Sequence, residues 1–267
     1  MSAPENSSEL FSRYENLRKA DLSGLDTSNV TNMRSMFYSC ENLTSLDISN
    51  FDTSKVTNMN SMFRNCESLT SINVSNFDTS KVTDMKGLFC SCESLASIDV
   101  SNFDTSKVTD MSLMFKDCKS LMNLDVSNFD TSNVMDMKNI FKKSSLEKIY
   151  LGESFVLVDE NEYEMFDDDF SGKIISTGET LTSDEWVQQA TIITGTKKGD
   201  KGATVKWLQR VLAKLGYAIG SADGSFGPKT EECLKKFQTG AGLTSSGIVD
   251  KETIKALCRE ISKMAAA

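Results

Sequence analysis

The heptapeptide FDTSKVT at residues 51–57 returns unchanged at residues 77 and 103, and as FDTSNVM at residue 129. A first version, LDTSNVT, begins at Leu25, so that each copy starts 26 residues after the previous one. Self-similarity at a fixed period of about 20 to 50 residues is the sequence signature of a repeat architecture. The first half of the chain is therefore predicted to consist of successive copies of one structural unit, preceded by an imperfect leading copy.

Apolar residues outside the heptapeptide also recur at intervals of 26 residues. They are Met33, Met59, Met85, Met111 and Met137; Phe37, Phe63, Phe89, Phe115 and Phe141; and Cys40, Cys66, Cys92 and Cys118. Within one copy, the apolar residues of segment 56–66 have helical spacing, which predicts a short helix or helical turn. Residues 69–74 read L-x-x-I-x-V, which predicts a short strand. Neither piece could bury its apolar face alone, but stacked coils could.

This 26-residue pattern resembles the BspA-type leucine-rich repeats of bacterial surface proteins, whose pattern is similar to FDTSxVTxMxxMFxxCxxLxxLDVSN. The resemblance covers residues from about 10 to 152. It implies a right-handed solenoid with a sheet along one face, in proteins that act as adhesins or surface ligands. The predicted fold class of residues 1–152 is therefore an α/β repeat solenoid that is leucine-rich-repeat-like.

The outward positions of the predicted strands form a candidate binding face, here called the strand face. Its residues are Ser45, Asp47, Ser71, Asn73, Ser97, Asp99, Asn123 and Asp125. The strand face is polar and mildly acidic, and it lacks the aromatic and arginine anchors that dominate many protein interfaces. Two interpretations stay open, a solvated surface and the ligand-binding face of the solenoid.

The cysteines also allow two interpretations. Neighbouring coils lie about 4.8 Å apart, so distance does not exclude disulfides between them, but a ladder of buried free thiols accounts for the spacing. One ligand per coil does not make a tetrahedral metal cluster, so no metal is expected. Cys90 stands where other copies have Tyr, Arg or Lys, which predicts an exposed, unpaired thiol. A disulfide between Cys233 and Cys258 is left open.

Residues 153–197 interrupt the repeat and are predicted to form an acidic cap or connector. Segment 159–169 carries seven carboxylates in eleven positions, but the spaced D-x-D-x-D-G loop of a calcium site is absent. The net charge is −5 over residues 1–150, −10 over residues 151–195 and +6 over residues 196–267. The basic C-terminal segment is thus the part suited to a polyanion, such as nucleic acid, wall teichoic acid or peptidoglycan.

The C-terminal segment has a pattern of its own. Apolar stripes predict three helices, near residues 205–215, 230–237 and 254–261, separated by two glycine-rich loops. The motifs LQRVLAKLGY at residue 208, DGSFGPKT at residue 223 and FQTGAGL at residue 237 resemble the peptidoglycan-binding-domain family found beside many wall hydrolases. Residues 198–263 are therefore predicted to form a small all-α three-helix bundle.

The resemblance implies a set of candidate peptidoglycan-binding residues in this bundle. They are Trp207, Tyr217, Asp223, Gly224, Phe226 and Gly227. Trp207 lies off the main apolar stripe, so it either stacks on a sugar or packs against the connector. Gln209 and Gln238 are expected to tie helix to loop by hydrogen bonds. The second loop begins with Ser246, where the family usually has an aspartate, so the two loops need not contribute equally to binding.

Several functions are disfavoured by composition. The chain has no histidine, which removes Ser-His and Cys-His nucleophile pairs and most zinc sites. The carboxylates of residues 1–150 recur with the scaffold, unlike the pair of dissimilar carboxylates that a glycosidase needs. No stretch approaches the roughly 18 to 20 apolar residues of a membrane span. We expect a non-catalytic protein with no cofactor, no metal, no nucleic-acid partner and no membrane span.

The predicted function is that of an adhesin-like cell-surface interaction protein. The C-terminal domain would hold it on peptidoglycan or an associated wall polymer, and the solenoid would meet an unknown host or bacterial surface ligand. The first residues lack a basic segment followed by an apolar one, so no secretory signal is expected in them. The expected location is the bacterial cell surface or wall. A phage virion or lysis-associated wall-binding protein is the alternative, and a scaffold whose bundle only caps the repeats is a third.

Overall fold

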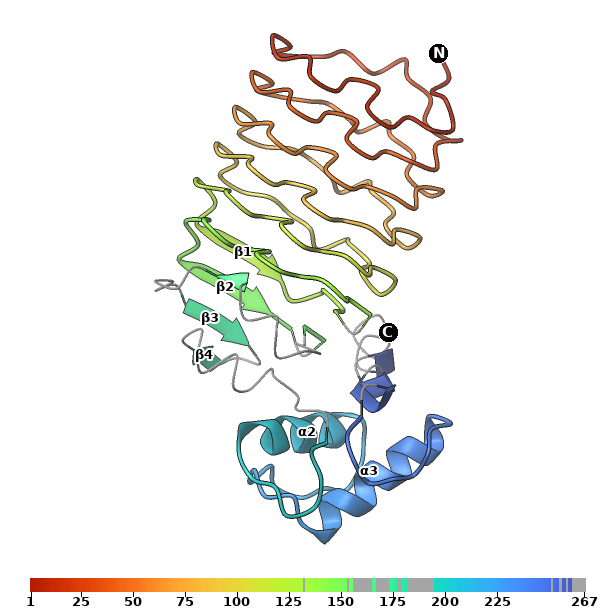
Figure 1. The fold of residues 1–267 in the computed structure, drawn as a ribbon, viewed down its shortest axis with the longest axis vertical. Coiled ribbons are helices and arrows are strands. Elements are labelled where there is room, and N and C mark those ends of the chain that lie inside the picture. Colours follow the sequence, from red (N-terminus) through yellow and green to blue (C-terminus); the bar gives the residue numbers. More distant parts are fainter. Residues whose placement is uncertain are drawn as a thin grey trace.

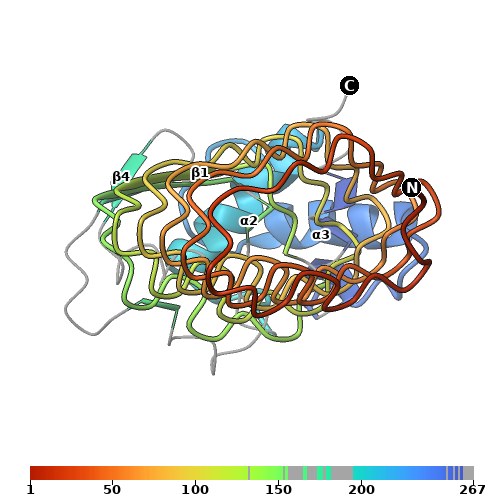
Figure 2. The ribbon, with the colours of Figure 1, turned by 90° about the horizontal axis from the view of Figure 1, so that it is seen from above.

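The computed structural model describes residues 1–131, 133–152, 154–155, 165–166, 173–176, 179–181, 195–250, 252–254, 256–257 and 259–260. Its first part is a stack of coils that lie directly on one another (Figure 1). Seen from above, successive coils follow the same flattened outline (Figure 2). Isolated parallel bridges join equivalent positions of neighbouring coils, 26 residues apart, as between Asn32 and Asn58 and between Asn58 and Asp84.

The segment expected to be helical forms two consecutive turns instead. The N–H of Met62 donates to the carbonyl of Met59, and the N–H of Cys66 donates to that of Phe63, each at 3.2 Å. The third residue of each turn, Ser61 or Asn65, has a φ of 56° or 61°, the sign that a type II turn requires. Two such turns in succession place apolar residues three and four apart, which imitates helical spacing.

Other N–H groups of this segment bond to the next coil rather than along a helix. Ser61 donates to the carbonyl of Lys86 at 2.8 Å, and Phe63 donates to that of Leu88 at 3.0 Å. We call this side of the stack the turn ridge, meaning residues 32–40 and their equivalents at 26-residue intervals. These bonds between coils hold positive φ even at Leu113, where φ is 64° and left-handed backbone costs an L-residue about 1–2 kcal/mol.

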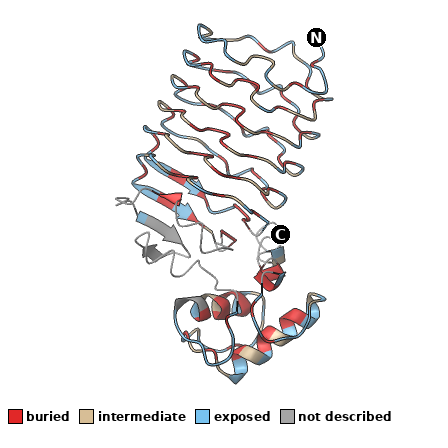
Figure 3. Ribbon diagram, viewed as in Figure 1, coloured by how far each residue is buried: buried red, intermediate tan, exposed pale blue. Residues whose placement is uncertain are grey.

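The opposite side of the coils alternates buried and exposed residues (Figure 3). Among the described residues, regular strands occur towards the C-terminal end of the stack: β1 (Asn123–Val126), β2 (Lys148–Leu151), β3 (Lys173–Ser176) and β4 (Glu179–Leu181). They form one sheet in this order, with β1, β2 and β3 parallel and β4 antiparallel to β3. The earlier segment 69–74 has the same alternation of burial but no assigned strand.

The sheet continues beyond residue 152, where the sequence predicted an acidic connector. Lys148 pairs with Lys173 at the same register of 25 residues by which Asn123 pairs with Lys148. Phe155, Met165 and Phe166 also belong to the core of the stack. The described residues between 154 and 181 therefore extend the stack, residues 195–197 bond to the C-terminal part, and most of the acidic run lies outside the described residues.

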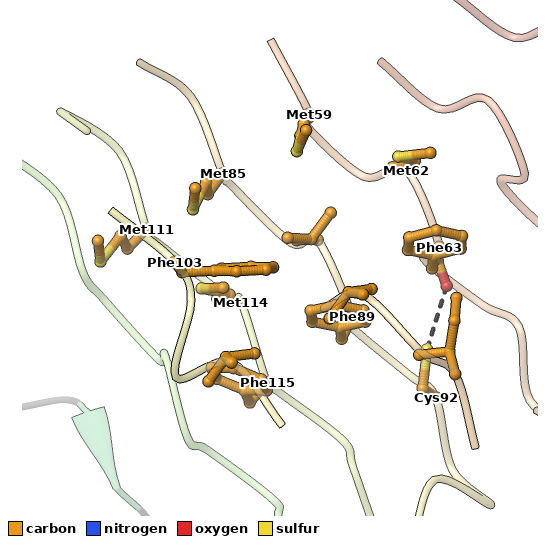
Figure 4. Packing of buried hydrophobic residues seen from close by; sticks show 14 of the residues in the cluster. Met59, Met62, Phe63, Met85, Phe89, Cys92, Phe103, Met111, Met114 and Phe115 are labelled. Atoms are coloured by element: carbon orange, nitrogen blue, oxygen red, sulfur yellow. Dashed lines mark hydrogen bonds between the residues drawn. The ribbon is translucent and has the colours of Figure 1, made fainter. Parts of the chain in front are cut away.

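Apolar side chains at recurring positions pack on one another along the stack axis (Figure 4). The rings of Phe37, Phe63, Phe89 and Phe115 follow in sequence, with neighbouring centroids 5.7 Å apart. All four side chains are fully buried. Each ring thus finds packing partners in the coils on either side, so a residue that recurs once per coil forms a continuous row through the core.

Recurring polar residues bond the backbone of a neighbouring coil. The Cys92 thiol donates to the carbonyl of Phe63 at 3.1 Å (Figure 4). The Thr79 hydroxyl donates to the carbonyl of Asp104 at 2.9 Å and accepts from its N–H at 2.8 Å. The Asn102 amide donates to two carbonyls of the preceding coil, at 3.1 and 2.9 Å. These side chains satisfy buried backbone groups that no sheet ladder reaches.

The recurring cysteines are free thiols, as the ladder interpretation predicted; they are Cys40, Cys66, Cys92 and Cys118. Burial raises the pKa of the Cys66 and Cys118 thiols, because a thiolate is poorly solvated there. The prediction of an exposed Cys90 is wrong, since its side chain is only 2% exposed. A Cβ at Gly87 would lie 3.6 Å from that of Cys90, an ordinary van der Waals contact, so Cys90 is packed beside Gly87. Cys233 is also free, and Cys258 lies outside the described residues.

The C-terminal part has a separate core. It contains α2 (Ala203–Lys214) and α3 (Pro228–Gly240), and residues 252–254, 256–257 and 259–260 are also helical. Its buried side chains include Leu208, Phe237 and Leu257, and none of them belongs to the core of the stack. Within the described ranges, no helix combines the length and apolar character needed to cross a membrane.

Truncating one ring of the phenylalanine series tests the core. We expect Phe89→Ala to lower the free energy of unfolding by about 3–5 kcal/mol, because it leaves a cavity between two rings. Chemical denaturation followed by circular dichroism measures the change. Met135→Ala, at a side chain that is 71% exposed, is the matched control and should stay within about 0.5 kcal/mol of the parent. Equal losses in the two variants would contradict the stacked core.

The turn ridge makes a second prediction at Leu113. Leu113→Gly should raise the thermal midpoint, because glycine adopts positive φ without strain and Gly87 already occupies the equivalent position one coil earlier. Leu113→Val should lower the midpoint, because a β-branched residue tolerates positive φ least. Differential scanning calorimetry measures the thermal midpoints of both variants. A midpoint of Leu113→Gly below that of Leu113→Val would show that Leu113 contributes more by packing than it costs in backbone strain.

Candidate functional site

The structure places all eight predicted residues of the strand face on the surface. Asp47 and Asp99 each accept a hydrogen bond at 3.0 Å from the N–H two residues later, Ser49 or Ser101. Hydrogen bonds from the same serines lower the pKa of both carboxyl groups. The recurrence of Asp or Asn at this position is therefore explained by the turn that follows, and ligand contact by the strand face stays a prediction.

In the C-terminal part, Gln209 of α2 holds the first glycine-rich loop. Its amide nitrogen donates to Asp223 Oδ1 at 2.9 Å, to the Ser225 carbonyl at 3.1 Å and to Thr230 Oγ1 at 3.2 Å. Its amide oxygen accepts from the Gly224 N–H at 2.8 Å. The Gln209 side chain is 3% exposed, so it anchors the loop from inside, as predicted.

Gln238 of α3 holds the second loop in the same way. Its amide nitrogen donates to Ser246 Oγ, the Ile248 carbonyl and Thr253 Oγ1, at 3.2, 2.9 and 3.1 Å. Its amide oxygen accepts from the Gly247 N–H at 2.9 Å. The Ser246 side chain therefore accepts from the anchoring glutamine of the second loop, as the Asp223 side chain does in the first loop. The anchoring role of Thr230 and Thr253 was not predicted, although Thr230 ends the DGSFGPKT motif and the same offset of 23 residues separates the two threonines and the two loop glycines.

The predicted binding residues do not form one cluster. The Gly224 carbonyl accepts from the N–H of Gly202 at 2.8 Å, so the first loop lies beside the start of α2. Tyr217 follows the end of α2 and packs edge-on against Phe237, with ring centroids 6.2 Å apart. A helix of this length spans roughly 18 Å. The loop and Tyr217 are therefore found at opposite ends of α2.

Comparison with known families bears on both parts of the chain. Residues 5–97 and 67–169 match the family described as Mycoplasma protein of unknown function, DUF285, and these matches together span more than half of the chain. The chain belongs to the DUF285 family. Residues 201–257 match a peptidoglycan binding domain, which supports binding to the cell wall and association with it.

Three of the predicted residues shape the first loop of the peptidoglycan binding domain. Phe226 is 3% exposed and belongs to the core. Gly224 has a φ of 73°, and a Cβ there would lie 3.1 Å from the Gly202 carbonyl oxygen, so only glycine fits this approach. Gly227 is the N-cap of α3, directly before Pro228. Ligand contact by these three residues would have to come from the backbone.

The remaining predicted residues offer side chains to a ligand. Trp207 and Tyr217 are partly exposed and pack against the core of this domain, and Asp223 is exposed. Lys206, which was not predicted, lies beside the first loop, since its Cβ is 3.7 Å from a Cβ placed on Gly224. In the sequence it is one of many solvated lysines, and only the fold puts it next to Asp223.

The two loops differ in how they should respond to acid. Hydrogen bonds from Gln209 and the Ser225 N–H lower the pKa of Asp223 below its ordinary value of 3.8. A lowered pKa means that the bonds stabilise the loop above the ordinary value and are lost as the pH falls through the folded value. Ser246 of the second loop does not titrate in this range.

Hydrogen exchange can test this difference. As the pH is lowered from about 5 to 2, the protection factor of the Ser225 N–H should fall while that of the Ile248 N–H is retained. Asp223→Ser, which copies the second loop, should remove the acid sensitivity and leave the fold intact. Equal loss of protection at both amides, or unchanged acid sensitivity in Asp223→Ser, would contradict this account.

Proposed function

We propose that this protein is a non-catalytic, wall-bound interaction protein of the cell surface. The peptidoglycan binding domain retains it on the wall glycan. The DUF285 stack, which we propose to be a leucine-rich-repeat-like solenoid, presents an extended surface to a protein or glycan ligand in the manner of an adhesin. The observation that carries the proposal is the match of residues 201–257 to a peptidoglycan binding domain in a segment of net charge +6.

The first loop and α2 supply the chemistry that a wall glycan needs. Peptidoglycan consists of amino-sugar chains with short peptides that carry free carboxylates. The partly exposed ring of Trp207 can stack on a sugar, and the Asp223 carboxylate can accept bonds from hydroxyl or amide groups. The Lys206 ammonium can pair with a peptide carboxylate. Gln209 fixes the loop in advance, which reduces the entropy cost of binding.

The carboxylates of the stack support a scaffold role rather than catalysis. Asp26, Asp52, Asp78 and Asp104 each accept the N–H two residues later, at 2.9 to 3.0 Å. These hydrogen bonds lower the pKa of Asp52 and Asp78, whereas a general acid at neutral pH needs a raised one. Together with a chain that has no histidine, this favours a binding protein.

Co-sedimentation with purified peptidoglycan sacculi tests the wall-binding part. The full-length chain should pellet with sacculi, and Trp207→Ala and Lys206→Gln should each weaken binding by about five- to tenfold, as expected for contacts worth about 1 kcal/mol or more. Asp223→Ser isolates the contribution of the Asp223 carboxylate to binding, because it keeps the loop geometry that Ser246 gives the second loop and removes only the carboxylate.

Lys236→Gln provides the matched control on α3, since this exposed lysine pairs with Glu232 at 2.7 Å away from the first loop. Its binding should equal that of the parent. A full-length chain that remains in the supernatant would refute wall binding. Equal weakening by Lys236→Gln and Lys206→Gln would show that only total charge matters.

A further inference from the structure

The turn ridge of the first coils contains a basic hollow that the strand face and the wall-binding loops do not use. Its volume is about 380 Å³, within the range of about 300–1,000 Å³ typical of small-molecule sites. Residues from four successive coils line it, among them Arg13, Arg34, Arg64 and Lys86. Glu9 is the one acidic residue of that lining. A local excess of positive charge thus lies on a stack whose net charge is negative.

The guanidinium groups of the arginines in the basic hollow have no ion-pair or hydrogen-bond partner among the described residues. No carboxylate there lies within ion-pair distance of Arg13, Arg34 or Arg64. The Nε of Arg64 is buried and has no hydrogen-bond acceptor. A buried, unsatisfied donor costs free energy that an incoming acceptor would recover. The guanidinium groups are therefore available to an anion.

A second observation shows how the hollow keeps its charge. At one recurring position of the turn ridge, the side-chain oxygen accepts a hydrogen bond from the N–H two residues later. Asn32 and Asn58 accept it at 2.9 Å. In later coils Asp84, Asp110 and Asp136 accept it at 2.8 to 3.0 Å. Asn and Asp serve this turn equally. Three of the four coils that line the hollow use the neutral residue, Asn6, Asn32 and Asn58, and the fourth, which supplies Lys86, has Asp84. Lys86 of the lining lies 3.8 Å from Asp110 of the next coil, so the unpaired positive charge of the hollow is that of its arginines.

We propose that the basic hollow binds a sugar that carries an oxyanion, either a carboxylate or a sulfate. Planar guanidinium groups match such oxyanions with paired hydrogen bonds. The hollow is larger than an inorganic ion requires. Tyr38 in its lining offers a ring surface to a pyranose, and Asn60, whose amide nitrogen donates to Asp84, offers its amide oxygen. The site lies in the DUF285 stack, so it is independent of wall binding by the C-terminal domain.

Isothermal titration calorimetry on the full-length protein at low salt tests the proposal with four probes. They are glucuronic acid, glucose 6-sulfate, glucose and inorganic sulfate. We expect saturable binding of at least one of the two acidic sugars, and the tighter of them identifies the preferred oxyanion. Glucose should not bind, and inorganic sulfate should bind more weakly than glucose 6-sulfate.

Variants assign the binding to the hollow. Arg34→Gln with Arg64→Gln should weaken it by at least about tenfold. Asn32→Asp with Asn58→Asp should weaken it similarly without loss of stability, because later coils already use aspartate in the same turn. Lys116→Gln is the matched control, since this lysine pairs with Asp117 at 3.3 Å outside the hollow, and it should bind as the parent does.

Three outcomes would overturn the proposal. The first is no binding of either acidic sugar by the folded protein. The second is binding that the Asn32→Asp and Asn58→Asp double variant leaves unchanged while its thermal midpoint matches the parent. The third is equal affinity for inorganic sulfate and glucose 6-sulfate, which would remove the role of the sugar ring. Sacculus binding is measured on the same variants and should be unaffected.

Discussion

Every coil of the DUF285 stack has to satisfy its backbone polar groups with the coil before it and the coil after it. Few regular strands share this task among the described residues, so side chains take much of it: the Cys92 thiol, the Thr79 hydroxyl and the Asn102 amide each bond a neighbouring backbone group. A side chain can do this only if it recurs at the same place in each coil. The near-identity of the copies is thus a hydrogen-bonding requirement as much as a packing one.

The same constraint determines where function can be located. Inward positions carry the phenylalanine series and the thiols, and the turn positions carry Asp or Asn, so these are not free to vary. Outward positions such as 34, 38 and 64 hold Arg, Tyr and Arg without disturbing any bond between coils. Variation in such a stack is therefore concentrated in a few outward residues that stacking brings together, such as those that line the basic hollow.

The sequence predicted the 26-residue period, the buried phenylalanines, the free thiols and the anchoring role of Gln209 and Gln238, because each depends on local pattern alone. It failed at segment 56–66, since two type II turns and a helix place apolar residues at the same intervals. The predicted end at residue 152 missed β3, because the FDTS heptapeptide does not recur before β3, although β3 pairs with β2 at the same 25-residue register that β2 has with β1. The basic hollow was not predicted, because Arg34 and Arg64 are 30 residues apart in the chain and meet only through stacking.

Because each coil contacts only its two neighbours, the stack can change length without a change of design. Duplication or loss of one 26-residue unit adds or removes one layer of about 4.8 Å and leaves every ladder intact. The gene encoding such a chain can therefore gain or lose whole repeats by recombination between its own copies. The length of the molecule then changes in steps of one coil.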